Sequence, residues 1–146
     1  MYPNLNLPNF SPRLRKEKEK LFIYDLVRKK FMLLTPEEWV RQHFINFLLT
    51  QQYSLSLLSV EKGHQLNKLL KRTDIVAYNR EGKIFLLVEC KASHIILTQT
   101  VFEQIFVYNL TLQAPFIAIT NGLQHYYFEK KENAYQEIES LPKFFL

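Results

Sequence analysis

Residues 83–91 read KIFLLVECK, and this stretch decides the fold class. Its apolar part, residues 84–88, is the longest strongly apolar run in the chain, and it ends on Glu89, Cys90 and Lys91. A short apolar run bounded by polar residues is typical of a buried strand. The run is far shorter than the roughly 20 residues that a bilayer-spanning helix needs. We therefore predict a buried strand here.

The residues before this stretch predict a hairpin partner for the strand. Residues 73–78 read TDIVAY, a second β-rich run, and the loop Asn79-Arg80-Glu81-Gly82 joins the two runs. Two β-rich runs separated by a polar loop that ends in glycine are typical of a β-hairpin. We therefore expect these two strands to lie side by side and antiparallel.

The residues after the stretch predict a crossover. A hydroxyl residue, Thr98 or Thr100, can cap a helix, and Pro115 prevents that helix from continuing. Residues 116–120, FIAIT, are typical of a buried strand. A strand, a helix and a strand between residues 83 and 120 form a crossover unit, in which the two strands run parallel.

The remaining segments extend this unit. Thr35-Pro36-Glu37-Glu38 has a hydroxyl cap, a first-turn proline and acidic residues, which predicts a helix from here to about Thr50. Further strands are expected at residues 21–25, 55–61 and 124–130, the last after an Asn121-Gly122 turn. The expected fold class is α/β, with a mixed central β-sheet flanked by helices in the order α-β-β-β-α-β-β. We expect a basic arm with a short strand at residues 1–35 and one folded domain at residues 36–146.

The composition indicates a globular protein. The chain has 146 residues, of which 47% are hydrophobic and 14% aromatic, and this length and composition support one domain with its own core. Cys90 is the only cysteine, so a disulfide framework is excluded. No segment resembles a signal peptide or a bilayer-spanning helix. We therefore expect a cytoplasmic protein with no membrane partner.

The net charge of +5 comes from one segment near the N-terminus. Residues 11–31 hold eight basic and three acidic side chains, whereas the basic and acidic side chains of residues 32–146 balance. Such a run forms either a solvated arm or an arm that contacts phosphates, and position alone leaves both interpretations open. The candidate nucleic-acid contacts are Arg13, Arg15, Lys16, Arg28, Lys29 and Lys30.

The central strand itself ends in ionisable residues. Alternate residues of a strand share a face, so Glu89 and Lys91 are expected on one face and Cys90 on the other. The Cys90 thiol has no evident base partner and is expected to be buried and inert. Glu89 and Lys91 are therefore the residues of this strand that could carry chemistry.

Folding the hairpin adds a carboxylate to this face. A loop with an even number of residues pairs Val76 with Phe85, which places Asp74 on the face of Glu89 and Lys91. An odd loop or a single bulge would move Asp74 to the other face. The expected group of two carboxylates and a lysine therefore depends on strand register.

Two carboxylates and a lysine at one edge of a sheet suit metal-assisted hydrolysis. Mg²⁺ prefers one or two carboxylates and keeps several waters that a substrate phosphate can share. A neighbouring lysine can steer or deprotonate the attacking water and stabilise negative charge in the transition state. An ordinary ion pair between Glu89 and Lys91 is the alternative, and the residues alone favour neither interpretation over the other.

Five motifs, taken in order, resemble one protein family. They are residues 35–42 (TPEEWVRQ), 71–76 (KRTDIV), 87–92 (LVECKA), 104–109 (QIFVYN) and 120–122 (TNG). Asp74 followed by Glu89-Cys90-Lys91 resembles the core of the PD-(D/E)xK nuclease superfamily. The five motifs together resemble the N-terminal nuclease domain of type I restriction enzyme R subunits, over a range from about Leu21 to Lys130.

This resemblance implies a fold, a reaction and a set of site residues. The fold is a restriction-endonuclease-like three-layer core, and the reaction is Mg²⁺-dependent hydrolysis of DNA phosphodiester bonds, with Mn²⁺ as a substitute metal. Asp74, Glu89 and the main-chain carbonyl of Cys90 would be the metal ligands. Lys91 would be the catalytic lysine.

The resemblance also implies roles for helix residues. The acidic residue of the first helix fits Glu37, which shares a helical stripe with the apolar Val40, and Glu38 is its close competitor. Gln104 would approach the site and assist catalysis. Tyr108, one turn further along the same helix, is expected in the core.

One departure from the family is that this sequence has no ATPase motor motif. Type I R subunits are long chains with a translocating ATPase, whereas this sequence has three glycines and no Gly-x-x-x-x-Gly-Lys-Ser/Thr loop. The expected partners are therefore DNA and either a second copy of the chain or a separate motor or specificity subunit. A non-catalytic nucleic-acid-binding or assembly module that retains the nuclease fold is the alternative function, and a plain structural domain ranks last.

Overall fold

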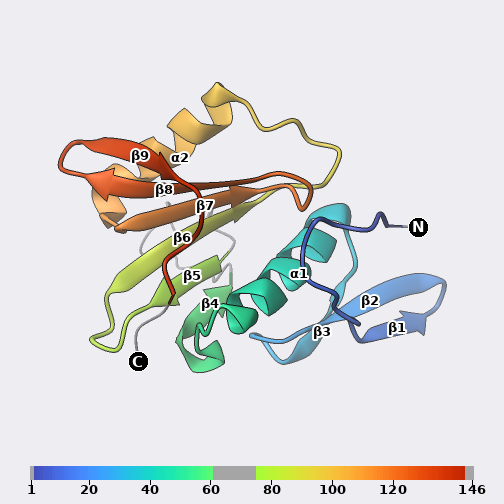
Figure 1. Ribbon diagram of the computed structural model, residues 1–146. Coiled ribbons are helices and arrows are strands. Elements are labelled where there is room, and N and C mark those ends of the chain that lie inside the picture. The colour runs from blue at the N-terminus through green and yellow to red at the C-terminus, as the bar shows by residue number, and fades with distance from the viewer. Residues whose placement is uncertain (1, 61–74, 144–146) are drawn as a thin grey trace.

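The computed structural model describes residues 2–60 and 75–143, which form two β-sheets and two α-helices (Figure 1). The strands are β1 (Leu14–Glu17), β2 (Lys20–Asp25), β3 (Lys30–Leu33), β4 (Leu58–Val60), β5 (Ile75–Tyr78), β6 (Ile84–Cys90), β7 (Phe116–Thr120), β8 (His125–Lys131) and β9 (Ala134–Ile138). The helices are α1 (Pro36–Thr50) and α2 (Gln99–Leu112), and a short 3₁₀ turn, η1 (Leu55–Leu57), precedes β4.

A six-stranded mixed sheet forms the centre of the molecule, in the order β4-β5-β6-β7-β8-β9. β6 and β7 are parallel, as predicted, and the other neighbouring strands are antiparallel. The two helices lie on opposite sides of this sheet (Figure 1). Val40 and Phe44 of α1 pack in one apolar cluster with Leu86, whereas Ile105 of α2 packs in another with Ile117. The predicted α/β architecture with a mixed sheet between helices is therefore confirmed.

The predicted helix starts are confirmed in detail. α1 begins at Pro36, and the Thr35 hydroxyl accepts a hydrogen bond from the Glu38 N–H at 3.0 Å. α2 is capped in the same way by Thr98 rather than by Thr100. Neither helix of the described residues is long and apolar enough to cross a bilayer.

Three strands, β1, β3 and β9, were not predicted. β1 reads LRKE and is exposed at all four positions, and β9 has no buried residue. These segments carry little apolar alternation, so pairing with β2 and β8 rather than their own pattern makes them strands. The strand expected at residues 55–61 is also shorter than predicted, because residues 55–57 form η1. The basic segment is thus largely a folded three-stranded antiparallel sheet, in the order β1-β2-β3.

The β5–β6 hairpin differs from the predicted register by two residues. Val76 pairs with Leu87 rather than with Phe85. The loop has an odd number of residues, because the Asn79 N–H donates to the Lys83 carbonyl at 2.8 Å, and a bulge next to the loop then shifts the ladder by one residue. An odd loop shifts the alternation of side chains across the hairpin by one residue, and the bulge shifts it by one more. The side chains of β5 and β6 therefore share faces as they would after an even loop. The predicted pairing is therefore wrong, although the predicted faces of β6 are right.

The residues before β1 lie across the turn between β7 and β8. The Asn6 N–H donates to the Gly122 carbonyl at 2.8 Å. Gly122 has a φ of +86°, and a Cβ added to it would lie 2.7 Å from Cδ2 of Leu5. The turn therefore needs glycine both for its backbone angle and for the approach of the N-terminal segment.

Gly122→Ala is expected to lower the free energy of unfolding by about 1–3 kcal/mol, because a left-handed alanine is strained and its methyl group displaces Leu5. Gly82→Ala is the matched control, since Gly82 has a φ of +80° but no atom within 4 Å of an added Cβ. Urea denaturation of both variants measures the difference. Equal losses would contradict a contribution from the Leu5 contact.

Two histidines link the stability of the fold to pH. The His125 Nε2–H donates to the Asn6 carbonyl at 2.7 Å, and Nδ1 of the same ring accepts from the Thr120 hydroxyl at 2.7 Å. The tautomer follows from these two partners. Burial lowers the pKa of His125 and of His43 below the ordinary value of 6.5. Both rings are therefore held neutral in the folded protein.

We expect the free energy of unfolding to fall as the solution is acidified below about pH 6.5. A histidine whose pKa is lower in the folded state than in the unfolded state stabilises the fold above its unfolded pKa, and this contribution is lost as pH falls through the folded pKa. Urea titrations between about pH 8 and pH 5 measure the slope. His125→Gln should flatten it, and a slope unchanged by this substitution would exclude His125 as a source.

Candidate functional site

A pocket opens between the end of β6 and helix α2. It is lined by Glu89, Lys91, Val101, Gln104, Ile105 and Tyr108. Lys91 Nζ lies 3.4 Å from Glu89 Oε2, and the Lys91 and Glu89 side chains are 33% and 11% exposed. The structure thus brings Glu89, Lys91 and Gln104, three of the predicted site residues, to one place.

The alternation of side chains along β6 sets the direction of the two charged side chains. Cys90, which lies between Glu89 and Lys91 in sequence, is fully buried. It belongs to the apolar cluster that contains α1 residues, on the side away from the pocket. The Lys91 N–H donates to the Thr120 carbonyl at 2.8 Å, so the strand geometry continues through Lys91. The side chains of Glu89 and Lys91 consequently point toward α2.

Helix α2 provides the opposite wall of the pocket. Gln104 and Tyr108 lie one turn apart on one face of the helix. Gln104 is exposed, whereas Tyr108 is half-buried and packs against the apolar cluster around Ile105 while lining the pocket. The expectation that Tyr108 is a core residue is therefore incomplete, because the same ring also forms part of the pocket wall.

Asp74 lies outside the described residues, so its predicted place beside Glu89 stays a prediction. Within residues 2–60 and 75–143, no group of three or more His, Cys, Asp or Glu side chains is arranged to hold a metal ion. Glu89 is the carboxylate that the described part of the chain contributes to this pocket.

A second hollow borders the start of α1. Its lining includes Glu37, Glu38, Arg41, Ala92 and His94, together with the end of β3. Ala92 follows Lys91 directly in the sequence. The hollow at the start of α1 and the Glu89–Lys91 pocket are therefore lined by consecutive residues of the sequence, Ala92 in the hollow and Lys91 in the pocket.

The two acidic residues of α1 lie in different surroundings. The Glu37 side chain is 45% exposed and its carboxylate lies 3.1 Å from Arg41. The Glu38 side chain is 6% exposed, and its oxygens accept hydrogen bonds from Arg28, Arg41 and Gln42. The predicted helix phase, which turned Glu37 inward, is thus wrong: Glu38 is the buried carboxylate, because three polar partners compensate for its burial.

Residues that follow β2 complete this charged cluster. Asp25 is fully buried and accepts hydrogen bonds from the N–H groups of Val27 and Arg28 at 2.8 and 2.9 Å, and from the Arg28 guanidinium. The Leu26 N–H donates to the Gln42 side chain at 3.3 Å. The cluster therefore attaches the three-stranded sheet to the start of α1.

The structure divides the candidate nucleic-acid contacts into two groups. Arg28 is bound by Asp25 and Glu38 and its side chain is 20% exposed, so its guanidinium is committed to contacts within the molecule. The other candidates are exposed on or beside the three-stranded sheet: Arg13, Arg15, Lys16, Lys29 and Lys30.

Sequence reasoning missed the cluster of Arg28, Glu38 and Arg41. The spacing of Glu38 and Arg41 by three residues is a recognisable helical ion pair, but Arg28 lies ten residues before Glu38 within a run of basic residues. An aspartate three residues before Arg28 was the available signal, since Asp often closes a turn through its own carboxylate.

Comparisons with known proteins identify one family. No curated protein and no solved structure matches the chain significantly. A family model described as type I restriction enzyme R protein N terminus (HSDR_N) matches residues 36–142. The match begins with α1 and includes Glu37, Glu89, Lys91 and Gln104. The chain therefore belongs to the family of the type I restriction enzyme R protein N terminus.

Proposed function

We propose that the protein is a Mg²⁺-dependent endonuclease that hydrolyses DNA phosphodiester bonds. The observation that supports this proposal is the meeting of Glu89, Lys91 and Gln104 in one pocket, in a chain of the R protein N-terminal family. A carboxylate, a cation and an amide around one pocket offer a metal ligand, a charge-stabilising group and a positioning group.

The donors at this pocket fit Mg²⁺. Mg²⁺ prefers oxygen ligands, usually one or two carboxylates with waters in the remaining positions. Glu89 is a largely buried carboxylate that faces a pocket open to solvent. We propose Asp74 and the main-chain carbonyl of Cys90 as further ligands, with Mn²⁺ as a substitute metal. When bound, the metal would supply an activated water and neutralise charge on the scissile phosphate.

The remaining residues of the site would act directly on water and phosphate. The Lys91 ammonium, 3.4 Å from Glu89, is placed to hold the attacking water and to stabilise the negative charge that develops on the phosphate. The Gln104 amide would orient the same water from the opposite wall. Glu37 is the proposed helix acid, because Glu38 already accepts three hydrogen bonds within the molecule.

One site of this kind cuts one strand, so a double-strand break would need a second copy of the chain or a second encounter. A separate motor or specificity subunit is the other proposed partner, because the sequence lacks a phosphate-binding ATPase loop. The exposed basic residues of the three-stranded sheet would add DNA affinity that falls as salt rises.

Nicking of supercoiled plasmid by the purified chain tests the proposed function. We expect conversion to open circles with Mg²⁺ or Mn²⁺ and none with EDTA. Lys91→Ala, purified in the same way, should be at least about 100-fold slower. Lys83→Ala is the matched control, since Lys83 is exposed just before the other end of β6.

Two outcomes would contradict the proposal. Equal cleavage by the unmodified chain and by Lys91→Ala would identify a contaminating nuclease. Binding to plasmid, linear and branched DNA without metal-dependent cleavage would favour the alternative function, a nucleic-acid-binding or assembly module that retains the nuclease fold.

A further inference from the structure

The three-stranded sheet carries aromatic and arginine side chains on one face. Arg15 pairs with Phe22, and Tyr24 pairs with Phe31, so each pair lies on the same side of the sheet. The Tyr24 N–H donates to the Arg13 carbonyl at 2.8 Å, which places Arg13 opposite Tyr24. We call these five residues, Arg13, Arg15, Phe22, Tyr24 and Phe31, the aromatic face.

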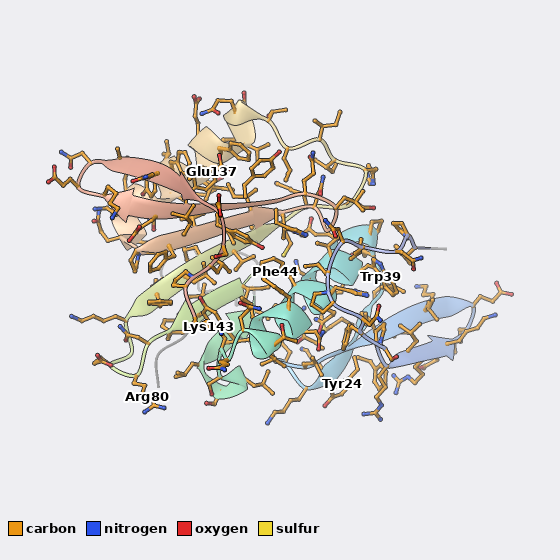
Figure 2. All side chains as sticks on the ribbon, viewed as in Figure 1. Tyr24, Trp39, Phe44, Arg80, Glu137 and Lys143 are labelled. Atoms are coloured by element: carbon orange, nitrogen blue, oxygen red, sulfur yellow. The ribbon has the colours of Figure 1, made fainter. Side chains whose placement is uncertain are left out.

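The aromatic face points away from the rest of the domain. Its neighbours in β2, Ile23 and Asp25, are fully buried on the other side of the sheet, where Asp25 joins the charged cluster of α1. Figure 2 shows Tyr24 below this sheet, on the side opposite to α1. All three rings of the face are half-buried rather than enclosed. Part of each ring is therefore accessible from solvent.

The rings hold the two arginines in place. The Arg15 guanidinium lies 4.3 Å from the centroid of the Phe31 ring, and the Arg13 guanidinium lies 4.9 Å from that of Tyr24. A guanidinium stacked on a ring keeps its N–H edges available for hydrogen bonds. Arg15 is 53% exposed, and its ion pair with Glu17 is on the surface. These arginines thus differ from Arg28, which is committed to buried carboxylates.

The basic segment keeps a large positive charge even when the buried pair of Arg28 and Asp25 is left out of the count. Once Arg28 and Asp25 are set aside as partners, residues 11–31 keep seven basic and two acidic side chains, an excess of five. A polyanion is the complementary ligand for such a surface. Among polyanions, the aromatic residues favour nucleic acids with unpaired bases, because a base can stack on a protein side chain only when the face of that base is free.

We propose that the aromatic face binds single-stranded nucleic acid. The bases stack on the Phe22 ring and on the guanidinium planes of Arg13 and Arg15, which the Tyr24 and Phe31 rings hold in place. The N–H edges of the two guanidiniums contact the phosphates between the bases. A duplex offers the same charge but keeps its bases stacked on each other, so it gains nothing from the rings. This inference extends the proposed function to the form of the ligand, but the binding itself requires neither a metal nor cleavage.

The aromatic face borders the hollow at the start of α1. Leu33 pairs with Phe22 at the end of β3 and is 50% exposed. Leu33 also lines the hollow that contains Glu37 and Ala92. A nucleic-acid strand that leaves the aromatic face past Leu33 therefore reaches the hollow that Glu37 and Ala92 line.

Fluorescence anisotropy with the full chain in EDTA tests this inference. The probes are a labelled polythymidine strand of about 15 nucleotides and a labelled duplex of the same length. We expect the single strand to bind more tightly. Phe31→Leu and Tyr24→Leu, which keep apolar bulk but remove the ring, should weaken single-strand binding by about 5- to 100-fold and change duplex binding by less than about twofold.

Two further variants distinguish the loss of stacking from the loss of positive charge and from the loss of an aromatic ring elsewhere in the protein. Tyr126→Leu removes a half-buried ring from the central sheet and should bind both probes as the unmodified chain does. Arg15→Ala should weaken binding of both probes and reduce the salt dependence by about one phosphate contact. Circular dichroism identifies any variant that fails to fold, and Phe22→Leu then replaces it.

The outcomes distinguish this inference from the proposed function. Duplex binding equal to or tighter than single-strand binding, or single-strand affinity unaffected by the ring variants, would overturn the inference and leave the nuclease proposal intact. Absence of binding to either probe would overturn it as well. Tight, ring-dependent single-strand binding by a chain that never cleaves plasmid would uphold it while rejecting the proposed endonuclease.

Discussion

Glu89→Gln is expected to lower the rate of metal-dependent DNA cleavage at least about 100-fold. The substitution keeps the shape of a side chain that is 11% exposed and faces the pocket beside Lys91, but it removes the negative charge that a metal ion needs. Titration calorimetry with Mn²⁺ should show binding weakened by at least about tenfold. This second measurement does not depend on activity.

Glu103→Gln is the matched control for this prediction. Glu103 precedes Gln104 on α2 and is exposed, so the same chemical change there should leave both cleavage and Mn²⁺ affinity nearly unchanged. Thermal unfolding of both variants shows whether the fold is retained. Unchanged Mn²⁺ affinity in a folded Glu89→Gln protein would remove Glu89 from the proposed metal ligands.

Glu38→Ala is expected to lower the free energy of unfolding by about 3–5 kcal/mol. The Glu38 carboxylate accepts hydrogen bonds from Arg28, Arg41 and Gln42. Its loss removes the Glu38 carboxylate from the Arg41 side chain, which is 4% exposed. Removing one partner of a buried charged cluster is costly, and this cluster also holds the three-stranded sheet against α1.

Glu37→Ala provides the comparison, because Glu37 is the next residue in α1 and contacts the same arginine. Its side chain is 45% exposed, so its removal should cost less than about 1 kcal/mol. Urea denaturation measures both values, and equal losses would show that the buried cluster does not stabilise the fold as described. A plasmid assay on Glu37→Ala, which is expected to remain folded, then tests Glu37 as the helix acid separately from stability.

The sequence by itself was sufficient for the features that arise from local geometry. Thr35 and Pro36 start α1 because capping acts within one helical turn. Glu89 and Lys91 face the same pocket because side chains alternate along any strand. The crossover from β6 to β7 followed from the order of apolar runs, since two strands separated by a helix run parallel.

Features that depend on pairing could not be predicted in the same way. The loop of the β5–β6 hairpin is odd and a bulge compensates for it, and neither changes the composition of the strands. β1 and β9 are polar segments that become strands because β2 and β8 offer free backbone groups beside them. Their formation depends on neighbours rather than on periodicity.

The tertiary structure alone decided how the charged residues are used. Glu37 and Glu38 are adjacent and chemically identical, and Glu38 is buried because Arg28 reaches it from the turn between β2 and β3. The same contact takes Arg28 out of the basic segment, while Arg13 and Arg15 stay exposed on aromatic rings. Sequence determines which side chains carry charge and on which side of a strand they lie. Which charges are neutralised inside the molecule is set by contacts between distant segments, because the cost of burying a charge depends on the partners that the fold brings to it.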